Sequence, residues 1–402
     1  MYLIWGMMND LSFLISLSMV SIQIPGIASA IQSLLLQIIY MDLLMTDKWL
    51  TPLLELQLFP EEDEENEAIN LFFNEQGFQS RLLIFNLGST LVFIAMHIML
   101  LLITLLVFYM RKFSRIATKL YGFLSSRLIW AGTIRFIIQQ FQPLLMSSII
   151  NISSYKIADL SRKSLETYCS YALSVIILAA LIFSTVAFTL LIKNGKASDR
   201  EFAPLMEGIR TSVNRSPSYA IILTLLKWTI LCLILILLTD YPAQQLQLLI
   251  ILASASTLYQ LSFPPQSDRQ ERWMTSFNEV MSFLYVLAQL SLTLTADIQL
   301  RQYIALAMLA LLLGTVFINL VKVLAQVCIL LFRKSRKNRD RVMVLKKYAE
   351  EKTEEGNGSE KVTVAVQRQQ YTRTLKKKVH TMAIPTEQIL TAGQDIQLQD
   401  IA

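Results

Sequence analysis

The chain has 402 residues, of which 54% are hydrophobic and only 16% are charged, with a net charge of +6. A soluble domain carries about a quarter charged residues, whereas here the charges gather in clusters separated by long uncharged runs. This composition excludes an ordinary soluble protein. The 3 cysteines and 2 histidines are far apart, which excludes a disulfide-rich module and leaves no metal centre or cofactor to expect.

Long uncharged runs predict transmembrane helices, because about 20 residues at 1.5 Å each cross a hydrocarbon core of about 30 Å. The candidate runs, in chain order, are 3–22, 24–44, 82–110, 128–150, 171–192, 219–239, 246–263, 277–295 and 303–332. Pro25 and Gly26 separate the first two runs and favour a tight reversal. The expected fold is all-α, a polytopic transmembrane helix bundle of about eight or nine spans (range seven to nine) over residues 1–332.

Lysine and arginine in the short loops predict the orientation, since cytosolic loops are rich in both. Basic residues gather at 111–119, at 193–215 and most densely at 333–339, so these segments are expected in the cytosol together with 264–272. The segments expected outside are then 46–80, 151–170, 240–245 and 296–301. The N-terminus is also expected outside if both of the first two runs cross.

The outer segment 46–80 carries an acidic cluster, formed by Glu61, Glu62, Asp63, Glu64 and Glu65. Concentrated carboxylates attract cations and can bind calcium weakly. The spacing of a calcium-binding loop is absent, so a solvated loop is the alternative.

The tail, residues 333–402, opens with a basic cluster, Arg333, Lys334, Arg336 and Lys337. Such a cluster next to a membrane is expected to bind anionic lipids. The rest is polar and mixed in charge, which predicts a mostly disordered cytosolic tail that could recruit cytosolic partners, with 342–351 as a candidate short helix.

Three polar residues lie inside or at the edge of predicted spans: Arg135, Asn278 and Glu279. Charged groups in a membrane are costly and often functional. The alternative for Arg135 is pairing inside the bundle, and for Glu279 it is capping of a helix N-terminus, which favours negative charge. Arg127 and Arg135 alone do not supply the repeated cations of a voltage sensor.

The last run, 303–332, is the candidate pore or gating helix, with Gly314, Asn319 and Lys322 on it. A small residue could act as a hinge and an amide could face water. Equally, Gly314 could allow close helix packing and Lys322 could extend its amine to the cytosol. The chain has no potassium-channel filter sequence.

Sequence motifs of common enzymes are also absent, so neither catalysis nor nucleic-acid binding is expected. Asn151-Ile152-Ser153 forms a glycosylation sequon on the predicted outer side.

Two stretches resemble a known family. The residues that carry the likeness are Pro25-Gly26, Tyr40-Met41-Asp42, Gly77-Phe78-Gln79-Ser80, Asn86-Leu87-Gly88-Ser89, Tyr259, Phe263-Pro264-Pro265, Arg269, Glu271 and Phe277-Asn278-Glu279. They resemble the C-terminal membrane region of large ciliate surface proteins with cysteine-rich or cadherin-like ectodomains, which is loosely similar to transient receptor potential-like membrane proteins. The resemblance implies a plasma-membrane protein with an extracellular N-terminal side. The family's ectodomain does not occur in these 402 residues, so either it is missing from this sequence or this is a reduced member of the family.

The sequence thus favours a channel-like or sensory multi-pass membrane protein that conducts cations and could form a homo-oligomer. A non-conducting receptor or membrane anchor is the main alternative, and a secondary transporter is a third. Against the transporter, no inverted repeat is visible.

Overall fold

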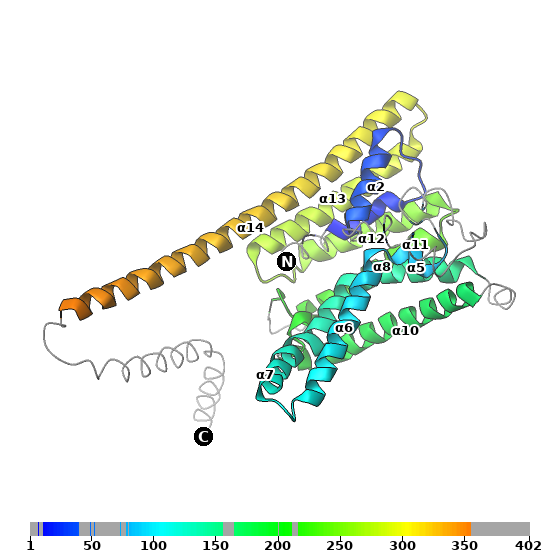
Figure 1. Cartoon of the computed structure of the whole chain (residues 1–402). Coiled ribbons are helices and arrows are strands. Elements are labelled where there is room, and N and C mark those ends of the chain that lie inside the picture. The colour runs from blue at the N-terminus through cyan, green and yellow to red at the C-terminus, as the bar shows by residue number, and fades with distance from the viewer. Residues whose placement is uncertain are drawn as a thin grey trace, which may run out of the picture. The chain divides into compact units, whose positions relative to one another are not determined.

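The computed structural model describes residues 11–39, 80–155, 165–199, 201–210 and 216–354, together with single residues at positions 7, 49, 52, 73 and 78. The chain divides into two units, Met1–Gln326 and Val327–Ala402. The principal helices (Figure 1) are α2 (Ile27–Ile39), α5 (Leu83–Leu87), α6 (Ser89–Met110), α7 (Arg115–Leu124), α8 (Ala131–Ser154), α10 (Leu165–Lys193), α11 (Ala220–Leu237), α12 (Pro242–Ser262), α13 (Arg269–Leu294) and α14 (Ile298–Glu354). The described residues contain no strand, although an isolated bridge pairs Ile209 with Gln266, so the all-α prediction is confirmed.

Five helices in the described residues are long and apolar enough to cross a membrane: Ser89–Met110, Leu165–Lys193, Pro217–Leu237, Arg269–Leu294 and Ile298–Phe332. They support the assignment of a helical membrane protein. The expected eight or nine spans are not confirmed, because the helices α8 and α12 and the N-terminal segments do not meet the same criterion.

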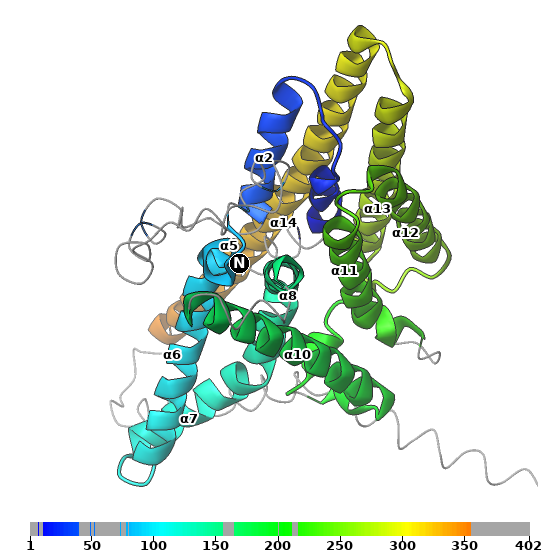
Figure 2. The ribbon, with the colours of Figure 1, turned by 90° about the vertical axis from the view of Figure 1, so that its right-hand side faces the viewer.

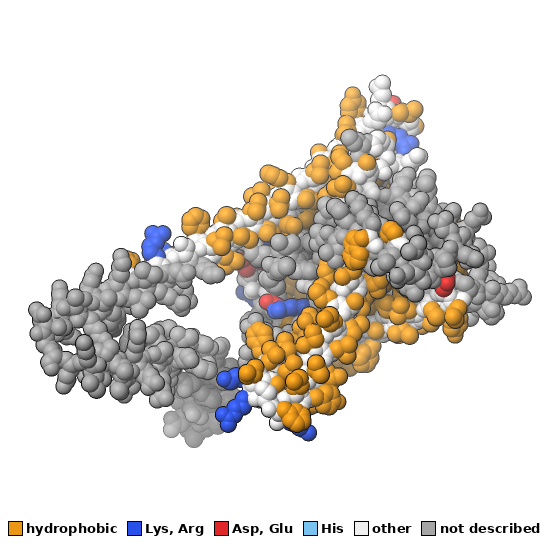
Figure 3. Space-filling model, viewed as in Figure 1, with side chains coloured by type: hydrophobic (Ala, Val, Ile, Leu, Met, Phe, Trp, Pro, Cys, Tyr) orange, Lys and Arg blue, Asp and Glu red, His pale blue; other side chains and the backbone are white. Residues whose placement is uncertain are grey.

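α6 and α10 carry the outer apolar surface of the bundle. Large side chains such as Met99 and Leu106 on α6 and Phe183 on α10 are more than half exposed, and Figure 3 shows hydrophobic side chains over the face of α6. A helix that exposes apolar side chains around most of its circumference suits contact with lipid. Gly88, with φ +49°, separates α6 from the short α5 inside the single predicted run 82–110.

α8 is the central helix. It packs against α5, α10 and α11, between which it lies in Figure 2. Its second half is buried without interruption from Gln140 to Asn151, with Pro143 inside the helix. A helix surrounded by protein does not need an apolar surface toward lipid, which explains the weak transmembrane signal of run 128–150.

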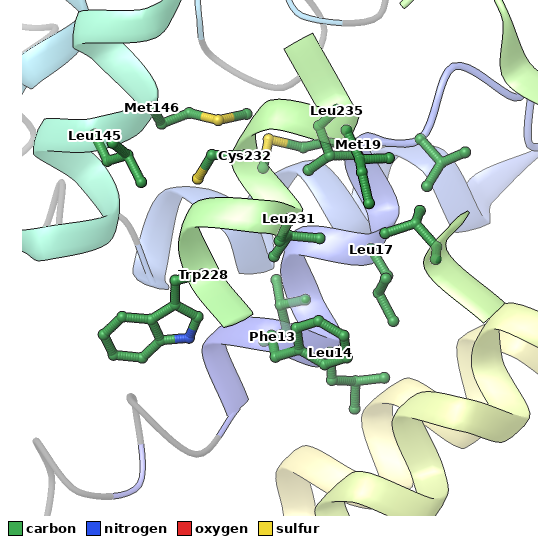
Figure 4. Close-up of a cluster of buried hydrophobic side chains, with 14 of the residues drawn as sticks. Phe13, Leu14, Leu17, Met19, Leu145, Met146, Trp228, Leu231, Cys232 and Leu235 are labelled. Atoms are coloured by element: carbon green, nitrogen blue, oxygen red, sulfur yellow. The ribbon is translucent and has the colours of Figure 1, made fainter. Parts of the chain in front are cut away.

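Residues 11–22 are also buried, every one of them. Residues 11–16 are helical, a 3-10 turn covers Leu17–Met19, and the chain is then extended as far as Pro25. Figure 4 shows Phe13, Leu14 and Leu17 packed with residues of α8 and α11, among them Met146 and Leu231. Irregular backbone at membrane depth is tolerated only where protein or water surrounds it, and here protein does.

The prediction of two complete N-terminal spans is not confirmed. The Pro25–Gly26 reversal is present, with Gly26 at φ +74°, but it lies at the end of the bundle expected outside: Ser21 bonds to Gln245, and Arg301 donates to the Gln23 carbonyl at 3.4 Å. Two crossings would put this reversal in the cytosol. The described part of α2 has 13 residues, or about 20 Å of helix, and residues 40–48 lie outside the described residues.

Two contacts join segments that the predicted alternation assigns to the same side. Arg81, directly after the segment 46–80 expected outside, accepts a 2.8 Å hydrogen bond from Asn151 of the segment 151–170, also expected outside. Of the segments expected inside, residues 208–210 pair with residues 265–267, since the Arg210 amide donates to the Pro265 carbonyl at 2.8 Å and that of Ser267 to Gly208 at 2.9 Å. The side of the membrane on which each pair lies stays a prediction.

α14 is longer than the predicted run 303–332, since it begins at Ile298 and ends at Glu354. The expectation of disorder directly after residue 332 is therefore wrong for residues 333–354, which are helical. This stretch is rich in good helix formers such as lysine, arginine and glutamate. Residues 355–402 lie outside the described residues.

Candidate functional site

An ion pair joins α11 to α13 inside the bundle. The Lys227 ammonium donates to both carboxylate oxygens of Glu279 at 2.7 Å, and the two side chains are only 11% and 18% exposed. Ser256 of α12 donates to the same carboxylate at 2.7 Å. The Lys227 nitrogen also lies 3.5 Å from the centre of the Phe13 ring. Three helices and the N-terminal segment thus share one charged centre.

A second polar contact joins α13 to α14. Asn278 and Asn319 exchange side-chain hydrogen bonds of 3.2 and 2.8 Å, and both are almost fully buried. One turn further along α14, Lys322 donates to Glu271 at 2.6 Å, and Gln326 donates to the other oxygen of that carboxylate at 3.2 Å. Residues three, four and seven apart lie on one helix face, so the sequence places these polar groups along one contact.

A cavity of about 600 Å³ lies between α11, α12 and α13, at their ends expected in the cytosol. Its walls include Lys227, Glu279 and Ser256, together with Tyr259 and many apolar side chains of α11. Small-molecule sites have this size and composition, mostly apolar with a few converging polar groups.

Glu271 and Asn278 belong to both features. They line the cavity, and they also bond to Lys322 and Asn319 on α14. Two side chains of the cavity wall are therefore also bonding partners of α14.

A polar network fixes the N-terminal segment at the centre of the bundle. Gln142 of α8 bonds through its two ends to Ser12 and Ser16. Gln289 of α13 donates to the Leu17 carbonyl at 2.7 Å, and the Ser21 amide donates to Gln245 of α12 at 3.0 Å. Glutamines from three helices thus bond to a segment whose own backbone is not helical throughout.

The predicted polar residues lie as follows. Arg135 pairs with Glu207 at 2.7 Å, and its side chain is half exposed, at 50%. Glu279 lies well inside α13, whose N-cap is Asp268, so the capping interpretation does not hold for it. Lys322 is 12% exposed and ion-paired with Glu271, which lies in the first turn of α13, so the extension of its amine to the cytosol stays a prediction. Asn151 is buried and bonds to Ser170, so its sequon is part of the packing.

Gly314 is not a close-packing position within this chain. A Cβ atom added there would meet no atom within 4 Å. The structure brings Asn319 and Lys322 together with Asn278 and with Glu271, but Gly314 takes no part in that contact.

Two predicted sites remain, the acidic cluster of the outer segment and the basic cluster of the tail. The acidic cluster 61–65 lies outside the described residues. Arg333, Lys334, Arg336 and Lys337 lie within the helical part of the tail, and Arg336 is exposed. Among the described residues, no group of histidines, cysteines and carboxylates could hold a metal ion.

Sequence reasoning missed Lys227, Ser256, Gln142 and Gln289. Lys227 is a single cation within the apolar run 219–239, and a lone intramembrane cation requires a partner of opposite charge. From this requirement, Glu279, the carboxylate inside run 277–295, could have been predicted as the partner of Lys227. The glutamines carry no comparable signal.

No family model, curated protein or solved structure matches the chain. The site is therefore interpreted from its own geometry.

Proposed function

We propose that this chain is a non-enzymatic sensory or channel-like protein of the plasma membrane, in which the cavity controls the contact between α13 and α14. The observation that carries the proposal is that Glu271 and Asn278 line the cavity and at the same time hold Lys322 and Asn319. A ligand in the cavity can thus favour one arrangement of α14 over another, which is the requirement for a switch.

Burial of these polar groups supports a functional role. Interhelical hydrogen bonds in membranes contribute about 0.6 kcal/mol on average, so apolar side chains at the same positions would hold the helices nearly as well. Polar groups retained at membrane depth are more typical of ion pathways and conformational switches than of anchors.

Reconstitution of the purified protein in planar bilayers tests conduction. Asn319→Leu leaves Asn278 without its partner and is expected to reduce the current. Gly314→Ala adds a methyl group in open space and stabilises the helical conformation by about 1 kcal/mol. It is therefore expected to alter gating without loss of insertion. Phe317→Leu, on the exposed face of α14, is the matched control and should behave like the wild type.

The anchor alternative predicts no current in any of these proteins, under voltage, calcium or membrane stretch, and that outcome would exclude the channel. The buried, discontinuous segment 11–26 favours the transporter alternative, because transporters bind ions at broken helices. Solute uptake into proteoliposomes without single-channel events would support a transporter instead.

A further inference from the structure

One side of the cavity wall is apolar and partly exposed. Leu223, Leu226 and Ile230 line the cavity from α11, and these side chains are 36–50% exposed. They lie on a helix long and apolar enough to cross a membrane. In a bilayer this side of the cavity would face acyl chains, and a molecule dissolved in the membrane would reach it without passing through water.

The charges in the cavity wall are already balanced. Lys227 pairs with Glu279, Glu271 with Lys322, and Glu207 with Arg135. A charged ligand would displace a partner from one of these pairs, and an uncompensated charge in a buried site is strongly unfavourable. The part of a ligand that enters the cavity is therefore uncharged.

One polar group in the wall has no partner. The Tyr259 hydroxyl oxygen is buried and makes no hydrogen bond to any described residue, and Tyr259 lines the cavity. A buried hydroxyl without a partner is costly, and as a donor it suits a carbonyl oxygen. Gln260 and Gln266, which also line the cavity, bond to each other at 2.8 Å and do not compete for this role.

We propose that the cavity binds an uncharged glycerolipid of the diacylglycerol class, taken up laterally from the cytosolic leaflet. One acyl ester carbonyl accepts the hydrogen bond of Tyr259, and the chains extend past Leu226 into the bilayer. The inference rests on the cavity named in the proposed function and adds its ligand class.

Photolabelling of the full-length protein in phosphatidylcholine nanodiscs tests the proposal, with a diazirine-bearing diacylglycerol as the probe. The readout is the ratio of label in peptides from α11 and α12 to label in peptides from α6, which reports unspecific lipid contact. Tyr259→Phe removes only the hydroxyl group and is expected to lower this ratio about two- to tenfold, the effect of one hydrogen bond. Leu226→Trp should block the opening and lower it further.

Two matched controls keep the result specific. Tyr241→Phe removes a hydroxyl from an exposed tyrosine outside the cavity, and Leu102→Trp enlarges an exposed side chain on α6. Both should label like the wild type.

Competition distinguishes ligand classes. Unlabelled dioleoylglycerol should displace the probe. Two charged lipids should compete at least about tenfold less well: dioleoyl phosphatidic acid, which has the same chains and a negative charge, and sphingosine, which has a positive charge. Equal labelling of Tyr259→Phe and wild type, or equal competition by a charged lipid, would overturn the proposal. Labelling measures occupancy and not current, so a cavity that binds the lipid in a protein without current would refute only the proposed function.

Discussion

Lys227 shows how much one charged residue can determine inside a membrane protein. Its ammonium is held by the Glu279 carboxylate, and that carboxylate also accepts from Ser256. The pair thus links α11, α12 and α13.

Substitution of either partner alone should be strongly destabilising. Lys227→Met leaves the Glu279 charge buried without compensation, at a cost of about 3–5 kcal/mol. The double variant Lys227→Met/Glu279→Gln removes both charges and should recover most of the loss. Thermal aggregation followed by size-exclusion chromatography in detergent measures this, with Lys119→Met on the exposed face of α7 as the control. A double variant no more stable than Lys227→Met would show that the pair is not the cause.

At this scale the sequence identified Glu279, Asn278, Asn319 and Lys322 as polar residues in apolar runs, but not their partners. A partner depends on which helices are neighbours, and hydropathy contains no information on neighbours. Glu279 therefore looked like a cap, and Lys322 like a side chain that reaches water.

Among the elements, the N-terminal segment and α8 were the least predictable. Both are surrounded by protein, so neither needs the long uncharged run that a lipid-facing helix requires. The run 219–239 matches α11 (Ala220–Leu237) closely, and the run 171–192 matches the end of α10 (Leu165–Lys193) but begins six residues late, because both helices carry the long apolar stretch that a lipid-facing helix requires. Hydropathy thus locates lipid-facing helices better than central ones.

The contact between these two elements yields a prediction of its own. Gln142→Leu removes the bonds to Ser12 and Ser16 and should loosen residues 11–21, with local opening about three- to twentyfold more frequent for a loss of about 0.6–1.7 kcal/mol. Hydrogen exchange of this segment, followed by mass spectrometry in nanodiscs, is the measurement. Gln139→Leu, on the same helix at a position with partial exposure, is the control, and equal exchange in the two variants would contradict the role of Gln142.

In the whole molecule, the alternation of loops anchored on the basic segments predicted that 193–215 and 264–272 lie on the same side. The structure brings these two segments together at 208–210 and 265–267. This contact requires the chain to return between them, and α12, with 21 residues and about 31 Å of helix, is the helix that runs back beside α11. The N-terminal reversal could not be placed in the same way, because residues 11–26 carry no lysine or arginine.

Membrane sidedness can be measured with single cysteines in a cysteine-free background. Residues expected outside are Gln23, Asp63 and Ala296, and those expected inside are Glu201 and Asn357. An impermeant thiol reagent applied to intact cells should label only the first group. Labelling of Gln23 from the cytosol would restore the two complete N-terminal spans, and labelling of Asp63 and Asn357 from the same side would overturn the whole orientation.

The double role of Glu271 and Asn278 has a thermodynamic consequence. When two sites bias one equilibrium, the coupling free energy between them is reciprocal. If a ligand changes the equilibrium constant of the α13–α14 contact by some factor, a change in that contact therefore alters the ligand's affinity by the same factor. Asn319 does not line the cavity, yet Asn319→Leu should shift the dissociation constant of the glycerolipid. The size of that shift, measured by equilibrium binding in nanodiscs, gives the energy available for gating without any recording of current.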